Sequence, residues 1–344
     1  MPDADMPAAS PGQTMALVQL AAGCWVTQAL HAVAALRVAD LMRDGPVPAE
    51  ALAEAAGANA GALRRVLRAL AGLGVFAEDG EGRFALTPMG ELLRADAPGS
   101  LRPFVLMLGA PEHWRPWGEA LHSVRTGEPA FDRVFGSPIF GYHAEHPEFA
   151  SLFDTGVASR SALEDRAVAA AYRFPEGATV VDVGGGRGTL LLEVLARDPS
   201  LRGVLFDQPH VVASAREHLG RDPEIAARCD VVTGDFFQAV PAGAEVYVLK
   251  KVVHDWDDGD VRRILASCRR AVRPRGRLLL VEHVVPPGDG PSFNKLLDLL
   301  MLVWTGGRER TEAEHAELLA AAGFAVVRTV PTESAVSVIE ATAD

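Results

Sequence analysis

A histidine with charged neighbours is the clearest candidate for proton transfer in this chain. His254 follows an apolar run at residues 245–249, which is predicted to be a strand, and it precedes Asp255. A histidine at the carboxyl end of a strand, followed by an acid, has the properties of a general base. Lys250 and Lys251 lie just before it and are two of the three lysines in the sequence. A purely structural histidine is the competing interpretation.

Two glutamates are candidates to orient this imidazole. Glu282 ends an apolar run at residues 277–281, and Glu309 lies in a glycine-containing segment just before a predicted helix. A solvated loop acid is the alternative interpretation of each. Asp257 and Asp258 are interpreted as caps of the helix that follows them, because aspartate favours helix N-termini.

A glycine-rich turn predicts a nucleoside site. Gly184, Gly186 and Gly188 follow the apolar run at residues 179–183, which is predicted to be a buried strand. The strand therefore ends in a glycine turn, where the backbone can approach a ligand closely. The dinucleotide fingerprint requires another glycine where Thr189 stands. The spacing therefore favours a nucleoside with a neutral linker over a pyrophosphate.

Acids follow the next two predicted strands. Asp207 comes directly after the run at residues 203–206, at a spacing from the glycine turn that suits the two hydroxyls of a ribose. Asp235 and Phe236 follow the third strand and offer a carboxylate for an exocyclic amine and a ring for adenine. Because the carboxyl ends of parallel strands meet at one edge of a sheet, we expect these side chains to converge on one crevice.

The elements that must position these residues alternate between strands and helices. Strands are predicted at residues 179–183, 203–206, 229–232, 245–249 and 277–281, with helices at 189–196, 211–219 and 260–272 between them. This pattern is typical of a parallel sheet with helices on both faces. Two more strands, at 324–330 and 335–340, follow a helix at 312–322. Their connection is too short for a crossover, so the last strand is expected to be antiparallel.

The first third of the chain predicts helices and a small hairpin. Helices at 47–56 and 60–73 precede strands at 74–76 and 83–86, which is the order of a winged-helix fold. Residues 1–100 carry seven arginines against eleven acids, and the hairpin turn is acidic. An acidic wing would be repelled by phosphates, so a structural or dimerising use is favoured over DNA binding.

Composition narrows the classes further. With 344 residues, 49% apolar and 23% charged, the chain is expected to fold into about two domains. A formal net charge of −12 argues against nucleic-acid partners. Three cysteines without a Cys-x-x-Cys pair predict neither disulfides nor a cysteine zinc site, which favours a cytoplasmic location.

Two apolar segments need separate interpretation. Residues 14–36 contain no charge but several polar side chains, so they are predicted to pack as a helix against another chain rather than to span a membrane. The acidic first residues do not resemble a secretory leader. Residues 103–154 are rich in aromatic side chains and form either a hinge core or the wall of an apolar pocket.

Together these motifs resemble those of the S-adenosylmethionine-dependent O-methyltransferases of the caffeate and acetylserotonin type, and most closely the bacterial members that methylate aromatic polyketides. The resemblance covers nearly the whole chain and rests on residues 182–188, 234–236, Lys250 with 254–256, Glu282 and 307–311. It implies an α/β fold, with a Rossmann-like seven-stranded methyltransferase domain after an N-terminal, mostly helical winged-helix dimerisation domain. The implied domains are residues 1–110 for dimerisation, 111–173 as a helical linker to the substrate pocket, and 174–344 for S-adenosylmethionine.

The resemblance also implies roles for individual residues. The expected contacts to S-adenosyl-L-methionine are Gly184, Gly186, Asp207, Asp235, Phe236 and Lys250. His254 matches the general base, flanked by Glu282 and Glu309, and no metal is expected. The expected substrate walls are Phe149, Phe153, Trp256, Asn294, Asp298 and Met301. Val157 stands where plant members carry a substrate-binding methionine, so their substrate preference does not transfer.

The implied function is methyl transfer to a hydroxyl of an aromatic small molecule by a homodimer, with no nucleic-acid or membrane partner. The ring system and the atom that accepts the methyl group stay open. One alternative is a hydroxylase or decarboxylase of the same fold that binds S-adenosylmethionine without transferring its methyl group. A more remote alternative is a winged-helix transcription regulator.

Overall fold

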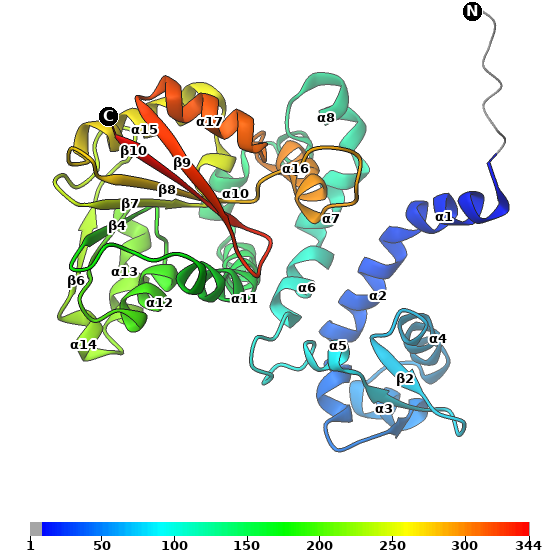
Figure 1. The fold of residues 1–344 in the computed structure, drawn as a ribbon. Coiled ribbons are helices and arrows are strands. Elements are labelled where there is room, and N and C mark those ends of the chain that lie inside the picture. Colours follow the sequence, from blue (N-terminus) through cyan, green and yellow to red (C-terminus); the bar gives the residue numbers. More distant parts are fainter. Residues whose placement is uncertain (1–8, 344) are drawn as a thin grey trace, which may run out of the picture. The chain divides into compact units, whose positions relative to one another are not determined.

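The chain divides into two compact units. The computed structural model describes residues 9–343, apart from the side chains of residues 210, 213, 214 and 217. Unit 1 comprises Met1–Trp114 and Pro147–Arg160, and unit 2 comprises Arg115–His146 and Ser161–Asp344 (Figure 1). Residues 111–173, predicted as one helical linker, are therefore divided between the units. The three-domain division stays a proposal.

Unit 1 contains the predicted winged helix. Its helices are α1 (Pro11–Ala21), α2 (Gly23–Ala35), a 3-10 helix (Val38–Met42), α3 (Ala49–Ala56), α4 (Ala60–Ala71), α5 (Pro88–Glu91) and α6 (Arg102–Gly109), followed by α7 (Pro111–Gly118) at its boundary. Strands β1 (Val47–Pro48), β2 (Phe76–Glu78) and β3 (Arg83–Leu86) form an antiparallel sheet in the order β1-β3-β2. Leu63, Leu67 and Leu70 recur on one face of α4 and are buried against Phe76 and Phe84.

Local boundaries in unit 1 differ from the predictions in two places. The helix predicted from residue 47 begins at Ala49, because Pro48 is extended and pairs with Arg83 in the sheet. The first strand of the hairpin begins at Phe76 rather than at residue 74, because Gly74 turns the chain at φ +80°.

The uncharged N-terminal segment forms two helices instead of the single one expected. α1 ends at Ala21 and α2 begins at Gly23, and the two axes bend by 46°. α1 has no buried residue, while Leu17, Leu20 and Trp25 are exposed. Among the described residues, no single helix is long and apolar enough to cross a membrane, although α1 and α2 taken together pass that test by length and composition.

Unit 2 contains the predicted α/β sheet. Its strands are β4 (Thr179–Val183), β5 (Arg202–Asp207), β6 (Cys229–Thr233), β7 (Val246–Lys250), β8 (Arg277–Glu282), β9 (Phe324–Pro331) and β10 (Ser337–Ala343). They form one seven-stranded sheet in the order β6-β5-β4-β7-β8-β10-β9. Strands β4 to β8 pair in parallel and β10 pairs antiparallel with both neighbours, which confirms the prediction for the last strand.

Helices cover both faces of this sheet. The helices of unit 2 are α8 (Ala120–Thr126), α9 (Ala130–Phe135), α10 (Ile139–Glu145), the second part of α11 (Pro147–Ala171), α12 (Thr189–Arg197), α13 (Pro209–Leu219), α14 (Pro223–Ala226), a 3-10 helix (Val253–Asp255), α15 (Asp258–Ala271), α16 (Phe293–Trp304) and α17 (Glu312–Ala321), of which α8, α9 and α16 pack on one another. Neighbouring strand residues alternate between two buried clusters: Val181 packs with α15 and α17, while Val180 packs with α11 and α12. The two-sided parallel sheet is therefore confirmed.

Candidate active site

The glycine turn lies where the first sheet strand ends. β4 is followed by Gly184, Gly186 and Gly188, which have φ values of +70°, +59° and +76°. Only glycine adopts this conformation without strain. A Cβ on Gly184 would lie 2.9 Å from a methyl group of Val252, whereas one on Gly186 would meet nothing within 4 Å. The turn therefore leaves backbone uncovered beside the carboxyl ends of the strands.

The predicted nucleoside carboxylates stand at neighbouring strand ends. Asp207 accepts hydrogen bonds from the backbone N–H groups of Gly186, at 2.8 Å, and Gln208, at 2.6 Å. Asp235, two residues after β6, accepts one from the N–H of Phe237 at 2.8 Å. Because β4, β5 and β6 are adjacent and parallel, both acids reach the same sheet edge as the glycine turn.

Asp182 is a buried carboxyl at this edge that the site prediction did not include. Neither of its carboxyl oxygens has a hydrogen-bond partner among the described residues. Its pKa is raised to about 7, chiefly by burial and also by the nearby Asp165 and Asp207 carboxylates, while Lys250 lowers it. Asp182 therefore holds a proton more tightly than an ordinary aspartate.

Phe236 belongs to an aromatic cluster beside the turn. Its ring centroid lies 4.9 Å from that of Phe237 and 6.1 Å from that of Trp256, both in edge-on geometry. Phe236 also lies 3.7 Å from where a side chain on Gly184 would begin. The structure thus places Phe236, predicted at adenine, in one cluster with Trp256, predicted at the substrate.

Lys250 is held by acids of α11. Its ammonium group forms an ion pair with Asp165, and Asp165 also accepts a hydrogen bond from the Thr189 hydroxyl at 2.6 Å. Glu164 lies 3.8 Å from the same ammonium group. Lys250 therefore ties the end of β7 to α11 and to the first turn of α12. The two adjacent acids of α11 carried no sequence signal, because a solvated helix face shows the same pattern.

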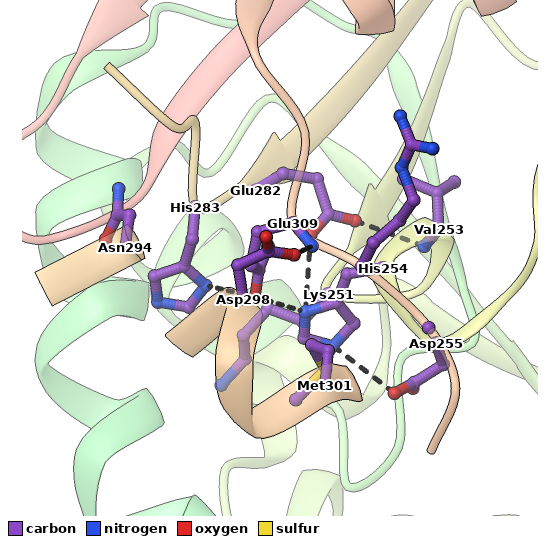
Figure 2. Close-up of polar contacts among 12 residues, drawn as sticks. Lys251, Val253, His254, Asp255, Glu282, His283, Asn294, Asp298, Met301 and Glu309 are labelled. Atoms are coloured by element: carbon purple, nitrogen blue, oxygen red, sulfur yellow. Dashed lines mark hydrogen bonds and ion pairs between the residues drawn. The ribbon is translucent and has the colours of Figure 1, made fainter. Parts of the chain in front are cut away.

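His254 meets both predicted glutamates (Figure 2). Its Nδ1 lies 2.9 Å from a carboxylate oxygen of Glu309 and 3.9 Å from one of Glu282, and its Nε2 lies 3.6 Å from Asp255. Residues 254, 282 and 309 come from the 3-10 helix after β7, the end of β8 and the loop before α17. The fold thus brings together three side chains that lie far apart along the chain.

Charge in this cluster favours the protonated imidazole. Burial lowers the pKa of His254, but the carboxylates of Asp255, Glu282 and Glu309 outweigh it and raise the pKa to about 10. Burial, followed by the repulsion from Glu309 and Asp255, raises the pKa of Glu282, while His254 lowers it. The free site therefore holds at least one extra proton at neutral pH.

The loop that carries His254 is held from two sides. Glu282 accepts hydrogen bonds from the N–H groups of Val252 and Val253 at 3.2 and 3.1 Å. The guanidinium of Arg310, which is fully buried, donates to the carbonyl oxygens of Val253 and Trp256, both at 2.9 Å. The sequence analysis missed Arg310, because an arginine in a predicted loop is usually solvated.

Two further contacts complete this support. A side chain on Gly307 would begin 2.1 Å from the carbonyl oxygen of His254, so only glycine fits there. Asp258 was interpreted as a helix cap together with Asp257, but only Asp257 caps α15. Asp258 instead binds the Arg310 guanidinium at 2.7 Å.

The predicted substrate residues of α16 have structural partners. The Asn294 amide donates to the carbonyl oxygens of Val284 and Ala335, at 2.9 and 3.1 Å. Asp298 accepts a hydrogen bond from the N–H of Glu309 at 2.8 Å, and Met301 is buried (Figure 2). Asn294 and Asp298 thus brace loops of the site, and their contact with substrate stays a prediction.

The aromatic segment is split in the structure. Phe149 and Phe153 lie in the unit 1 part of α11, with ring centroids 6.4 Å apart. In unit 2, Phe131 is fully buried and packs against Phe135 at 4.7 Å and Trp304 at 6.1 Å. Phe131 is therefore core while Phe140 is exposed, and the roles of Phe149 and Phe153 as pocket walls stay predictions.

A second histidine, which sequence analysis missed, lies beside the first. His283 is fully buried, and its ring is parallel to that of His254 within 9°, with centroids 6.4 Å apart. Ligating atoms of His254, His283 and Glu309 lie within 4.8 Å of one another, a spacing suited to a metal ion. Nδ1 of His254 already lies at hydrogen-bond distance from Glu309, whereas Nδ1 of His283 lies 3.7 Å from the same oxygen, so we interpret the group as a cluster of interacting polar side chains. The expectation of no metal stays a prediction.

Comparison with known proteins agrees with this geometry. Residues 117–325 match the O-methyltransferase domain model, and residues 18–96 match the O-methyltransferase dimerisation domain model. A phenazine O-methyltransferase of Lysobacter antibioticus is 47% identical over 94% of this chain and 95% of its own length. A mitomycin biosynthesis 6-O-methyltransferase of Streptomyces lavendulae is 43% identical over 90% of this chain and 88% of its own.

A solved structure has the same fold. The methyltransferase CalO1 of calicheamicin biosynthesis, in its S-adenosylhomocysteine-bound form, superposes with a TM-score of 0.90. The two sequences are 40% identical, and the match covers 98% of this chain and 100% of that one.

Proposed function

The chain belongs to the O-methyltransferase family, and from this premise we propose that its acceptor is an aromatic polyketide or related secondary metabolite and that His254 is the general base. It is an S-adenosylmethionine-dependent enzyme that methylates a hydroxyl group of an aromatic compound. The contact between His254 and Glu309, at the same sheet edge as the glycine turn, carries this proposal.

The residues at the sheet edge fit the methyl donor. When bound, S-adenosylmethionine supplies an electrophilic methyl group on a positively charged sulfur. The excess of carboxylates around His254 suits a positively charged ligand, and the glycine turn, which has open space at Gly186, admits one closely. We propose that Asp207 binds the ribose and that Asp235 and Phe236 bind the adenine.

Lys250 keeps a place in this proposal with a changed role. Its ammonium group already pairs with Asp165, so we propose that it supports the donor by fixing α11 and α12 beside the glycine turn. The carboxyl oxygens of Asp182 lie at the same edge but are buried, so we do not propose them as direct contacts of the donor.

Nε2 is the ring nitrogen of His254 that does not bind Glu309, and it lies 3.6 Å from the Asp255 carboxylate. Nδ1 of His254 binds Glu309, which leaves Nε2 to take the proton of the acceptor hydroxyl. A phenol has a pKa of about 10, and without the donor the carboxylates raise the pKa of this imidazole to about 10 as well. The pKa of His254 would fall with another cation in the site, which increases the neutral, active form. The methylation rate should therefore rise with pH up to this lowered pKa.

The acceptor is proposed to contact residues on both sides of His254. Trp256 and Met301 offer apolar surface. Asn294 and Asp298 offer polar groups in addition to their hydrogen bonds to the backbone of neighbouring loops. Phe149 and Phe153 are proposed as further aromatic walls. An apolar enclosure of this kind aligns oxygen, methyl carbon and sulfur, which is the main requirement of the reaction.

We also propose a homodimer formed through the N-terminal domain. The match to a dimerisation domain and the exposed apolar residues Leu17, Leu20 and Trp25 support it. Light scattering should give twice the chain mass, and a monomer would contradict the proposal. A cytoplasmic location is proposed on the three free cysteines.

One incubation tests the function. The purified protein is mixed with S-adenosylmethionine labelled in its methyl group and a panel of phenolic aromatic compounds, and products are analysed by mass spectrometry. The expected product gains one labelled methyl group on oxygen. A product that gains oxygen or loses carbon dioxide without the label would favour the hydroxylase or decarboxylase alternative. A product labelled on nitrogen would show that the acceptor atom is nitrogen and would leave the proposed role of His254 in place.

A further inference from the structure

The pair formed by His254 and Glu309 continues into a longer buried chain of polar groups (Figure 2). The Glu309 oxygen that binds His254 also lies 3.7 Å from Nδ1 of His283. Nε2 of His283 lies 3.3 Å from Glu164, and the other carboxylate oxygen of Glu164 lies 3.0 Å from the ammonium group of Lys251. A carboxylate thus stands between two parallel imidazoles, and the second imidazole is anchored in turn.

The connected polar side chains are buried, so each of them needs a polar or charged partner. The side chains of His283 and Glu309 are 0% and 1% exposed, and that of Glu164 is 4% exposed. Charged groups removed from water require partners, and an apolar core of the same shape would often be at least as stable. Stability alone therefore does not account for a histidine at position 283.

The orientation of Glu309 depends on its two histidine neighbours. One of its carboxylate oxygens faces both imidazoles, and the other has no hydrogen-bond partner among the described residues. Asp298 binds the backbone N–H of Glu309, so this contact does not fix the orientation of the carboxylate. Without His283, the contact with His254 itself would be the main restraint on this carboxylate.

We propose that His283 is a positioning residue for methyl transfer: anchored by Glu164, it holds Glu309 against Nδ1 of His254 so that Nε2 faces the acceptor. The proposal rests on the proposed role of His254 as the base. A partner that fixes the ring and tautomer of an active histidine is a general device, because the unused nitrogen decides which nitrogen reacts.

The same contact sets how strongly His254 holds its proton. By holding Glu309 against Nδ1, His283 keeps in place a carboxylate that favours the protonated imidazole, so its removal should lower the pKa of His254. The charged and titratable groups around this chain are Glu164 and Asp165 on α11, Lys250 and Lys251 at the end of β7, Asp255, Glu282, Asp298 on α16 and His315 on α17. None of these is changed in the test below.

The test uses the two nitrogens of His283 separately. In H283N the amide can occupy the position of Nδ1, which faces Glu309, whereas in H283Q it can reach the position of Nε2, which faces Glu164. We expect H283N to keep most of its kcat and H283Q to lose roughly ten-fold, with the KM for S-adenosylmethionine unchanged in both. H122L is the matched control. His122 lies in α8 and forms a 3.7 Å ion pair with Glu128, and neither residue belongs to the polar groups described above.

A measurement without turnover separates positioning from packing. Histidine-labelled protein without ligand is titrated by NMR, and the pKa of His254 is expected to fall by about half a pH unit or more in H283Q and to stay near the wild-type value in H283N. Equal kcat and equal His254 pKa in the two variants would overturn the proposal, as would a raised pKa in H283Q. If wild type and H122L methylate no acceptor, the proposed function fails instead, while the titration still decides the placement of His283.

Discussion

The two halves of the site are held together in opposite ways. At the donor edge, Asp207 and Asp235 bind the backbone of the loops directly beside them, within a few residues or one neighbouring strand. At the base, His254 depends on Glu309, Arg310 and Glu282, which lie far along the chain. The donor edge is thus a property of local turns, whereas the base exists only when β7, β8 and the loop before α17 are assembled. Substitutions should therefore affect the two halves separately.

The largest effect is expected from removal of the base. His254→Ala should lower kcat for a phenolic acceptor by roughly 10²–10⁴-fold, the usual contribution of a positioned base. Donor binding, measured by calorimetry, should change little, because the donor edge is supported locally. An unchanged rate would mean that the pocket works by alignment alone.

The next effect concerns the support of the base loop. Arg310→Met should lower stability by roughly 2–6 kcal/mol, measured by urea unfolding, because it leaves two loop carbonyls without their donor, whereas the Asp258 carboxylate, 39% exposed, can be solvated. Arg310→Lys should restore little, because one ammonium group cannot match the planar guanidinium. Full stability in the lysine variant would show that charge alone holds the loop.

A smaller effect is expected at the donor edge. Gly184→Ala places a methyl group 2.9 Å from Val252 at φ +70°, so the turn must shift and S-adenosylmethionine should bind at least about ten-fold more weakly. Gly177→Ala is the control, because Gly177 has φ +71° and open space around it, away from the turn. Calorimetry should show unchanged donor affinity in the control. Equal losses in both variants would indicate general strain.

The smallest effect is a pH dependence of stability at Asp182. Its folded pKa of about 7 exceeds the ordinary value of 3.8, so the folded state binds the proton more tightly and stability falls as pH rises from about 4 to 7. Asp182→Asn removes this titration. The free energy of unfolding of the variant, relative to that of wild type, should therefore rise by roughly 1–3 kcal/mol between pH 5 and pH 8, measured by urea unfolding. A gap that stays constant with pH would contradict the raised pKa.

Much of the fold was predictable because its signals are local. The five parallel strands, the antiparallel last strand and the hairpin of the winged helix follow from apolar runs and short connections. The errors arose where a single residue acts against its neighbours. Pro48 delays the start of α3, and a break before Gly23 divides the uncharged helix into two.

The sequence by itself determined the sheet, the glycine turn and the strand ends at which Asp207, Asp235 and His254 stand, because hydrophobic periodicity and glycine placement act over a few residues. Only the tertiary structure decided which acids and cations meet. Glu164, His283 and Arg310 are ordinary residues of a helix, a strand end and a loop until packing removes them from water. Once they are buried, each must find a charged or polar partner, and those partners place the imidazole of His254.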